Sequence, residues 1–172
     1  MRLGQPSDTS LVARSVGEFG RALVAAASYL ERQGAPVAPA ALSQHACIVH
    51  DVGPVSAHWR FLGPKGPHEI EVTGKFSATN SEVVRQAALS GHGIALLSEP
   101  QVLDDILAAR LYRLLPDYPT ERTKIFLFYP SRRHLPPRTR VVIDFLVERF
   151  DEVGARLADE RVWGELETVW LV

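Results

Sequence analysis

Three consecutive polar residues, Thr79, Asn80 and Ser81, are the best candidates for binding an anion. They precede an apolar pattern of helical spacing at 83–88, so each could cap a helix that begins here. The first turn of a helix offers unpaired N–H groups and a partial positive charge, which suit a carboxylate or phosphate. The alternative is plain helix capping, which needs only one of the three residues.

Two other groups of chemically capable residues favour a structural explanation. Segment 88–93 contains Ser90, His92 and two glycines, but a helix end followed by a strand reverses the order of a G-x-S-x-G nucleophile elbow. His45, Cys47 and His50 have metal-binding side chains, yet on a strand His50 would point away from the other two. We therefore predict no metal site, no cofactor and no enzymatic activity.

Alternating strands and helices must position these residues. Short apolar runs alternate with amphipathic patterns, which predicts an α/β fold with a largely buried sheet. Segment 69–73 alternates polar and apolar residues and should have one face in solvent. We expect the other strands within 22–27, 47–49, 59–62, 93–97, 111–115 and 125–129, and the helices after Ser28, at 81–90, after Ser98 and from Pro136 to about Leu157.

The expected helices carry start and stop signals. Ser or Thr stands three residues before Glu or Gln at three helix starts, which predicts capping boxes. Gly34 is expected to end the short helix after Ser28, and Gly91 the helix at 81–90. The boxes are Ser28/Glu31, Thr79/Glu82 and Ser98/Gln101.

Two helices show apolar residues at helical spacing. In the helix after Ser98, the predicted buried face is Val102, Leu103, Ile106 and Leu107. In the last helix, the apolar residues at this spacing are Val142, Phe145, Leu146 and Phe150.

Bulk composition limits the classes of function. The 172 residues are 46% hydrophobic, enough for one core or two small lobes. The formal net charge is −1, so we expect no broad positive field for DNA. The single cysteine, Cys47, lies in an apolar run and should be buried and inert, and Trp59 is expected in the core rather than on a ligand. Without a signal peptide or membrane helix in the pattern, a cytoplasmic location is expected.

An ordered set of segments lies within residues 2–150: Arg2-Leu3-Gly4, 8–14 (DTSLVAR), 29–36 with Leu42 and His45, 80–97 with Gly91 and Gly93, 114–118 (LLPDY) and 129–136 (YPSRRHLP). No single segment is diagnostic, but their order and spacing together are specific. The set resembles the effector-binding domain of LysR-type bacterial transcription regulators.

This resemblance implies a periplasmic-binding-protein-like fold of two α/β lobes joined by crossing strands. Residues 24–127 would form a nearly complete second lobe, residues 1–23 and 128–150 would form part of the first, and residues 151–172 would be a tail. The family's winged helix-turn-helix, linker helix and leading first-lobe elements find no counterpart in the sequence. We interpret this as an N-terminal truncation.

The resemblance also implies a function. A small-molecule effector, with carboxylates as the candidate class, would bind between the lobes near Thr79–Ser81, with Phe19, Gly20 and Ser131 as wall residues at the crossing points. Binding would be transmitted to DNA-binding helices in a homo-oligomer, at least a dimer. The alternative is a stand-alone small-molecule binding protein without a DNA-binding role. An enzyme is disfavoured because the sequence shows no recognisable pair of nucleophile and base.

Overall fold

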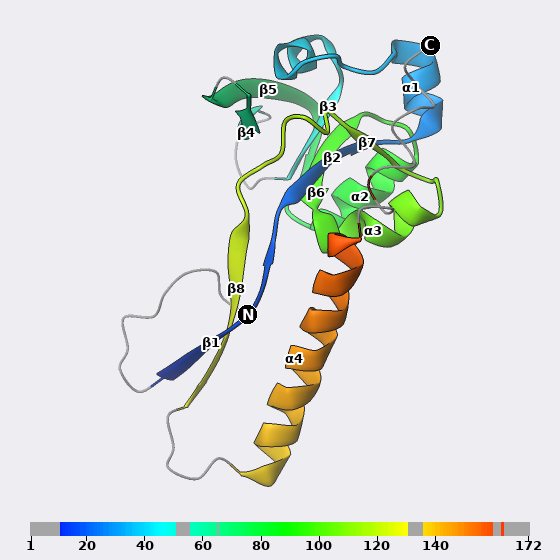
Figure 1. The fold of residues 1–172 in the computed structure, drawn as a ribbon. Coiled ribbons are helices and arrows are strands. Elements are labelled where there is room, and N and C mark those ends of the chain that lie inside the picture. Colours follow the sequence, from blue (N-terminus) through cyan, green and yellow to red (C-terminus); the bar gives the residue numbers. More distant parts are fainter. Residues whose placement is uncertain (1–10, 51–55, 65, 131–135, 160–162, 164–172) are drawn as a thin grey trace. The chain divides into compact units, whose positions relative to one another are not determined.

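The computed structural model describes residues 11–50, 56–64, 66–130, 136–159 and 163 (Figure 1). The chain divides into two compact units between Phe19 and Gly20 and between Glu121 and Arg122. Unit 1 contains the described residues 11–19, 122–130 and 136–159. Unit 2 contains the described residues 20–50, 56–64 and 66–121, together with Trp163.

Unit 2 is built on a six-stranded sheet of order β4-β5-β3-β6-β2-β7. Strand β3 is parallel to both β5 and β6, whereas β2 is antiparallel to β6 and β7, and β4 is antiparallel to β5. The helix α2 connects β5 to β6 as a crossover between parallel strands. The elements are β2 (Arg21–Ala25), α1 (Ala27–Gln33), η1 (Pro39–Gln44), β3 (Cys47–His50), β4 (Ser56–Gly63), β5 (Gly66–Ala78), α2 (Ser81–Leu89), β6 (Ile94–Ser98), α3 (Glu99–Leu107) and β7 (Tyr112–Leu114).

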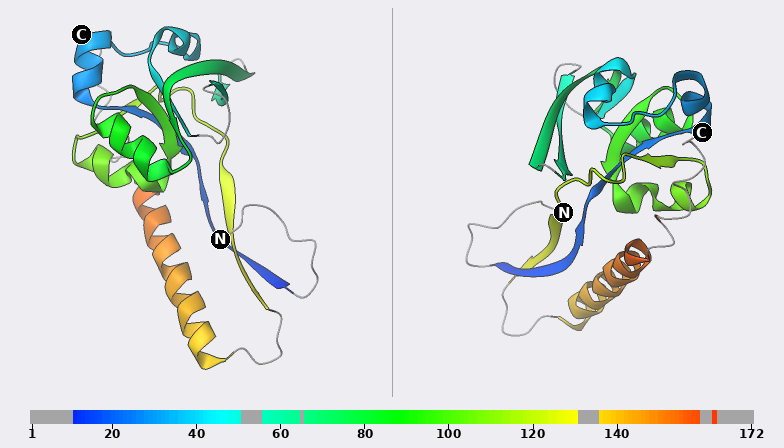
Figure 2. Two further views of the ribbon diagram at one scale, coloured as in Figure 1. Left: turned by 180° about the vertical axis from the view of Figure 1, so that it is seen from behind. Right: turned by 45° about the horizontal axis from the view of Figure 1, so that its top comes forward.

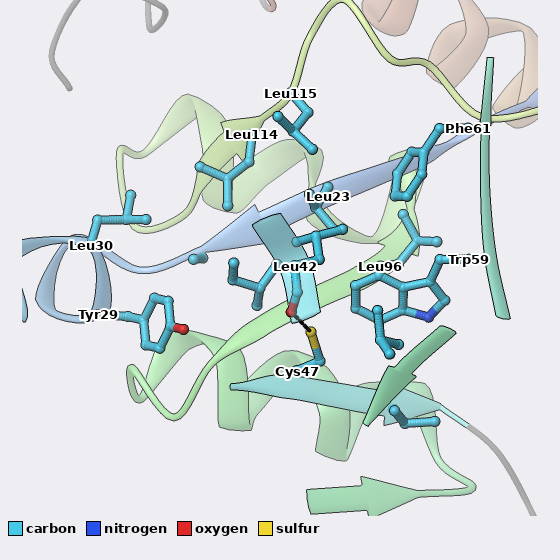
Figure 3. Close-up of a cluster of buried hydrophobic side chains, with 14 residues drawn as sticks. Leu23, Tyr29, Leu30, Leu42, Cys47, Trp59, Phe61, Leu96, Leu114 and Leu115 are labelled. Carbon is cyan, nitrogen blue, oxygen red and sulfur yellow. Dashed lines mark hydrogen bonds between the residues drawn. The ribbon is translucent and has the colours of Figure 1, made fainter. Parts of the chain in front are cut away.

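Two apolar cores lie on opposite faces of this sheet, because side chains of a strand alternate between its faces. In β2, Leu23 and Ala25 belong to one core, and Ala22 and Val24 belong to the other. The first core takes in residues from α1, η1 and the β4–β5 hairpin (Figure 3). The second takes in residues from α2 and α3, which Figure 2 shows in green on one side of the sheet.

Unit 1 is smaller. Strands β1 (Leu11–Phe19) and β8 (Thr123–Pro130) form a two-stranded antiparallel sheet, and α4 (Pro137–Ala158) packs against β1. The ring of Phe19 stacks on that of Phe150, with centroids 6.1 Å apart. Ile143 and Leu157 are the buried residues of α4.

The structure confirms the α/β class and each of the expected strands and helices, with longer bounds for β4, β5 and β8. Gly34 and Gly91 do end α1 and α2, and their φ angles of 74° and 72° lie in the left-handed region that favours glycine. The extension of the last helix to about Leu157 is also confirmed, since α4 ends at Ala158. The lobe ranges 1–23, 24–127 and 128–150 stay a prediction.

The predicted capping boxes are wrong. Ala26, not Ser28, is the N-cap of α1, and it makes no side-chain cap bond. Asn80, not Thr79, caps α2, and Ser98 occupies the N-cap of α3 without a side-chain bond. A cap shifts by one or two residues when the backbone leaves the extended region earlier or later, and tertiary packing decides this.

Two burial predictions also need correction. Leu107 is 51% exposed, and Asp105 lies on the buried side of α3 instead. Side chains 125–129 of β8 are only half-buried, since a single helix covers only one face of a two-stranded sheet. In α4, Val142 and Phe145 of the expected apolar spacing are more than half exposed, and Ile143 is buried. Among the described helices, none is long and apolar enough to cross a membrane.

Candidate functional site

The carboxyl ends of β3, β5 and β6 meet at one edge of the unit 2 sheet, because these strands are parallel. His50 ends β3, Ala78 ends β5 and Ser98 ends β6. The antiparallel β2 begins at the same edge, where Arg21 pairs with Ser98. In open α/β sheets, ligands bind outside the carboxyl ends of the strands. We refer to this part of unit 2 as the carboxyl edge.

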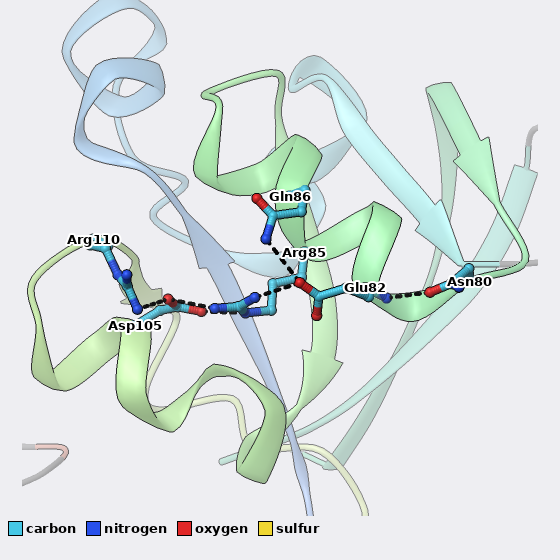
Figure 4. Close-up of polar contacts among 6 residues, drawn as sticks. All are labelled: Asn80, Glu82, Arg85, Gln86, Asp105 and Arg110. Carbon is cyan, nitrogen blue, oxygen red and sulfur yellow. Dashed lines mark hydrogen bonds and ion pairs between the residues drawn. The ribbon is translucent and has the colours of Figure 1, made fainter.

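Helix α2 begins at the carboxyl edge. The Asn80 Oδ1 accepts a hydrogen bond from the Glu82 N–H at 2.8 Å, and the Asn80 carbonyl accepts one from the Val84 N–H at 3.2 Å (Figure 4). Thr79 and Asn80 are exposed, and Ser81 is half-buried. Capping therefore accounts for the Asn80 side chain, whereas the cap does not need the hydroxyl groups of Thr79 and Ser81.

His50 also contributes to the carboxyl edge. Its Nε2 lies 3.0 Å from the carbonyl oxygen of Thr79. A carbonyl can only accept, so Nε2 carries the hydrogen and donates it. This bond joins the end of β3 to the residue before the α2 cap. The sequence pattern drew attention to His50 only as a metal ligand, and no local signal links it to a residue 29 positions away.

A buried ion network fixes α2 to α3 (Figure 4). Asp105 is fully buried and accepts from Arg85 Nε at 2.5 Å and Nη2 at 2.8 Å. The Arg110 Nη2 lies 2.6 Å from Oδ1 of the same carboxylate, the oxygen that also accepts from Arg85 Nη2. The hydrogen bond with Asp105 is the main cause that raises the pKa of Arg85, so the guanidinium stays charged.

The same arginine reaches the first turn of α2. Arg85 Nη1 donates to Glu82 Oε1 at 2.6 Å, and Gln86 Nε2 donates to the same oxygen at 2.8 Å. Hydrogen bonds from Gln86 and Arg85 lower the pKa of Glu82. The Glu82 carboxylate is thus directed along the helix, toward Arg85 and Gln86.

Comparison with known proteins places this geometry in a family. The model for the LysR substrate binding domain matches residues 1–151. The chain belongs to this family. The periplasmic-binding-protein-like α/β fold expected from the resemblance is thereby confirmed.

The relatives of this LysR substrate-binding domain include HTH-type transcriptional regulators. It is 32% identical over 157 residues to regulator DmlR of Escherichia coli (strain K12), covering 88% of this chain and 50% of that protein. It is 32% identical over 158 residues to CrgA of Neisseria meningitidis serogroup C, covering 91% of this chain and 52% of that protein. The chain therefore spans about half the length of the curated relatives it matches.

Solved structures agree with this assignment. The regulatory domain of CrgA, a LysR-type regulator from Neisseria meningitidis, has a TM-score of 0.76 at 29% identity, covering 87% of this chain and 73% of that one. The regulatory domain of AphB from Vibrio vulnificus has a TM-score of 0.71 at 29% identity, covering 86% of this chain and 73% of that one.

The remaining predicted site residues of this LysR domain fall in different places. Phe19 is buried at the end of β1 in unit 1, against Phe150. Gly20 is buried at the start of unit 2. Ser131 lies outside the described residues. The roles of these three as effector-binding residues, like those of Thr79, Asn80 and Ser81, stay predictions.

His45 and Cys47, whose side chains could bind a metal, have other contacts. Tyr29 Oη accepts from the Ala46 N–H at 3.0 Å and is also hydrogen-bonded to His45 Nδ1, 3.0 Å away. The Cys47 thiol is buried, 3.7 Å from the Leu42 carbonyl, and burial raises its pKa to about 12. Within the described part of the chain, no three His, Cys, Asp or Glu side chains gather to hold a metal ion.

Proposed function

We propose that this domain is the ligand sensor of a LysR-type transcription regulator, and that it binds a small anionic effector, with a carboxylate as the favoured class. The observation that carries the proposal is the start of α2 at the carboxyl edge. There the partial positive charge of a helix N-terminus coincides with the exposed residues Thr79 and Asn80 and the half-buried Ser81.

The surroundings of this helix start support a binding role. The Asp105–Arg85 pair holds α2 against α3, and the His50 bond holds the Thr79 carbonyl. Donor groups at the start of α2 would therefore keep their directions when a ligand arrives, which lowers the cost of ordering them. Catalysis is not part of the proposal, because the relatives are transcription regulators.

In this proposal, effector binding shifts the population between discrete arrangements of a homo-oligomer. DNA would be bound by a helix-turn-helix domain elsewhere in the full-length regulator, which would act in the cytoplasm. The regulators among the relatives do not favour the alternative of a stand-alone binding protein. Phe19, Gly20 and Ser131 are proposed to line the same site.

A thermal-shift screen against aliphatic and aromatic carboxylates tests the proposal. A ligand at a hundredfold excess over its Kd stabilises a protein by about 2.7 kcal/mol, which is readily measured. The informative variant is Asn80→Asp. Aspartate caps a helix as well as asparagine does, so the unliganded protein should keep its stability. The added negative charge should weaken carboxylate binding by roughly tenfold or more, since like charges meet at the helix start.

Thr79→Val and Ser81→Ala complete the set, because they remove hydroxyl groups that the cap does not use. A matched control is Ser43→Ala, in η1 and outside the carboxyl edge, which should leave binding unchanged. If a carboxylate found in the screen binds the Asn80→Asp variant as tightly as the parent protein, the effector does not sit at the start of α2.

A further inference from the structure

Glu99, the first residue of α3, is a buried acidic residue whose contacts lie where the chain enters unit 2. Glu99 as a whole residue is only 9% exposed. The Glu99 Oε2 accepts from the Gly20 N–H at 2.8 Å, and the Gly20 carbonyl accepts from the Glu99 N–H at 3.1 Å. The two residues, 79 positions apart, therefore bind each other reciprocally.

A second reciprocal pair stands beside the first. The Arg21 N–H donates to Thr120 Oγ1 at 2.7 Å, and Thr120 Oγ1 donates to the Arg21 carbonyl at 3.1 Å. Thr120 is 8% exposed. The preceding residue is also held, because the Leu62 N–H donates to the Pro119 carbonyl at 2.7 Å. The hydroxyl of Thr120 thus takes the place of a strand neighbour for Arg21.

These two pairs hold the residues next to both divisions between the units. Gly20 follows the first division, after Phe19, and Thr120 precedes the second by one residue. Space at Gly20 is tight: a Cβ there would lie 3.0 Å from the Glu99 Oε1. Gly20, Arg21, Glu99 and Thr120 all belong to unit 2, and we refer to these four residues as the connector clamp.

We propose that the connector clamp anchors both connecting segments to the carboxyl edge, and so limits the reorientation of the two units. In this clamp Glu99 is the positioning residue for the first segment, through Gly20, and Thr120 holds the second segment to Arg21. Each of these bonds leaves fewer backbone bonds of the connectors free to rotate. Glu99 directly follows Ser98, which ends β6 at the carboxyl edge. An effector that displaces the start of α3 would change the restraint, and only this last consequence rests on the proposed function.

Distance measurements between spin labels test the clamp in the whole chain without any effector. Cysteines introduced at Gln33 in unit 2 and Arg140 in unit 1, both exposed, accept labels, while the buried Cys47 does not compete. Glu99→Ala should broaden the distribution of distances relative to the unmodified chain. Glu99→Gln retains an acceptor oxygen for the Gly20 N–H and should restore the narrower distribution.

Amide hydrogen exchange gives a second readout. Loss of a hydrogen bond to a charged acceptor should speed exchange of the Gly20 amide by roughly ten- to a hundredfold in Glu99→Ala. Glu31→Ala, at an exposed position of α1, is the matched control and should change neither measurement. Thr120→Val, which keeps the side-chain shape but removes the hydroxyl, should also broaden the distribution and speed exchange of the Arg21 amide.

Circular dichroism establishes that each variant is folded. A folded Glu99→Ala protein whose distances are as narrow as those of the parent would overturn the proposal. So would a Glu99→Gln protein as broad as Glu99→Ala, because the acceptor oxygen would then not be the cause. If Glu99→Ala does not fold, Thr120→Val decides in the same way. A failed carboxylate screen leaves these outcomes untouched, since no effector is used.

Discussion

Removal of the Asp105 carboxylate should destabilise unit 2 more than any other single change to a polar residue in the α2–α3 pair. Asp105 is fully buried, accepts hydrogen bonds from two nitrogens of Arg85, and forms an ion pair with Arg110. Arg85 has a side chain only 18% exposed, so it cannot recover full hydration after the carboxylate is lost. Arg110, with 56% of its side chain exposed, can return to water.

The expected magnitude follows from this asymmetry. Breaking a buried pair by removing one partner costs about 3–5 kcal/mol, since the remaining charge stays buried. Folded domains are stable by only about 5–15 kcal/mol, so Asp105→Ala should lose a large fraction of that free energy. For a unit of this size, each kcal/mol lowers Tm by roughly 4–8 °C. The Tm should therefore fall by more than about 10 °C.

Urea unfolding followed by circular dichroism, with fluorescence of the buried Trp59 as a probe of unit 2, measures the change. The double variant Asp105→Leu/Arg85→Met should be more stable than Asp105→Leu alone, because it also removes the guanidinium nitrogens that lose their carboxylate acceptor. The control is Arg149→Ala, which removes an exposed pair with Glu152 and should cost less than about 1 kcal/mol. A cost below about 1 kcal/mol for Asp105→Ala would refute the reasoning.

Three further outcomes are expected. Cys47 should react with a thiol reagent only after unfolding, because burial raises its pKa to about 12; rapid labelling of the native protein would contradict this. Burial lowers the pKa of His45, so the unfolded chain binds more protons than the folded one, and stability should fall as the pH drops below about 6.5. His45→Asn should flatten that decline. An equal decline in the variant would show that His45 is not its cause. The chain should self-associate in light scattering through exposed apolar residues of α4, and Phe145→Glu should lower the mass; a parent protein that is already monomeric at high concentration would rule this out.

Local patterns predicted most of the elements because each depends on residues close in sequence. The apolar run at 93–97 becomes β6, and the glycines after α1 and α2 take the left-handed conformation that ends a helix. The anion-binding hypothesis for Thr79–Ser81 also came from local capping chemistry. The exact cap was missed because three adjacent residues could all serve, and the backbone selected Asn80.

The missed residues depend on contacts far apart in the chain. Glu99 meets Gly20 across 79 positions, and Thr120 meets Arg21 across 99. Asp105 is buried in α3 although the apolar spacing of the sequence placed it outside the predicted buried face, and its arginine partners make that burial tolerable. Sequence alone could not name these partners.

Helix α3 links the two parts of unit 2 that matter most for the proposals. At its start, Glu99 binds Gly20 and holds the first connector, and six residues or about 1.7 turns later Asp105 binds Arg85 and holds α2. A ligand that moves the start of α2 would therefore act on α3 through a charged pair as well as through the apolar core that the two helices share. Loosening that pair should weaken the response of the connectors to an effector, whereas loosening Glu99 should free the connectors even without one. The two classes of variant thus separate signal transmission from restraint.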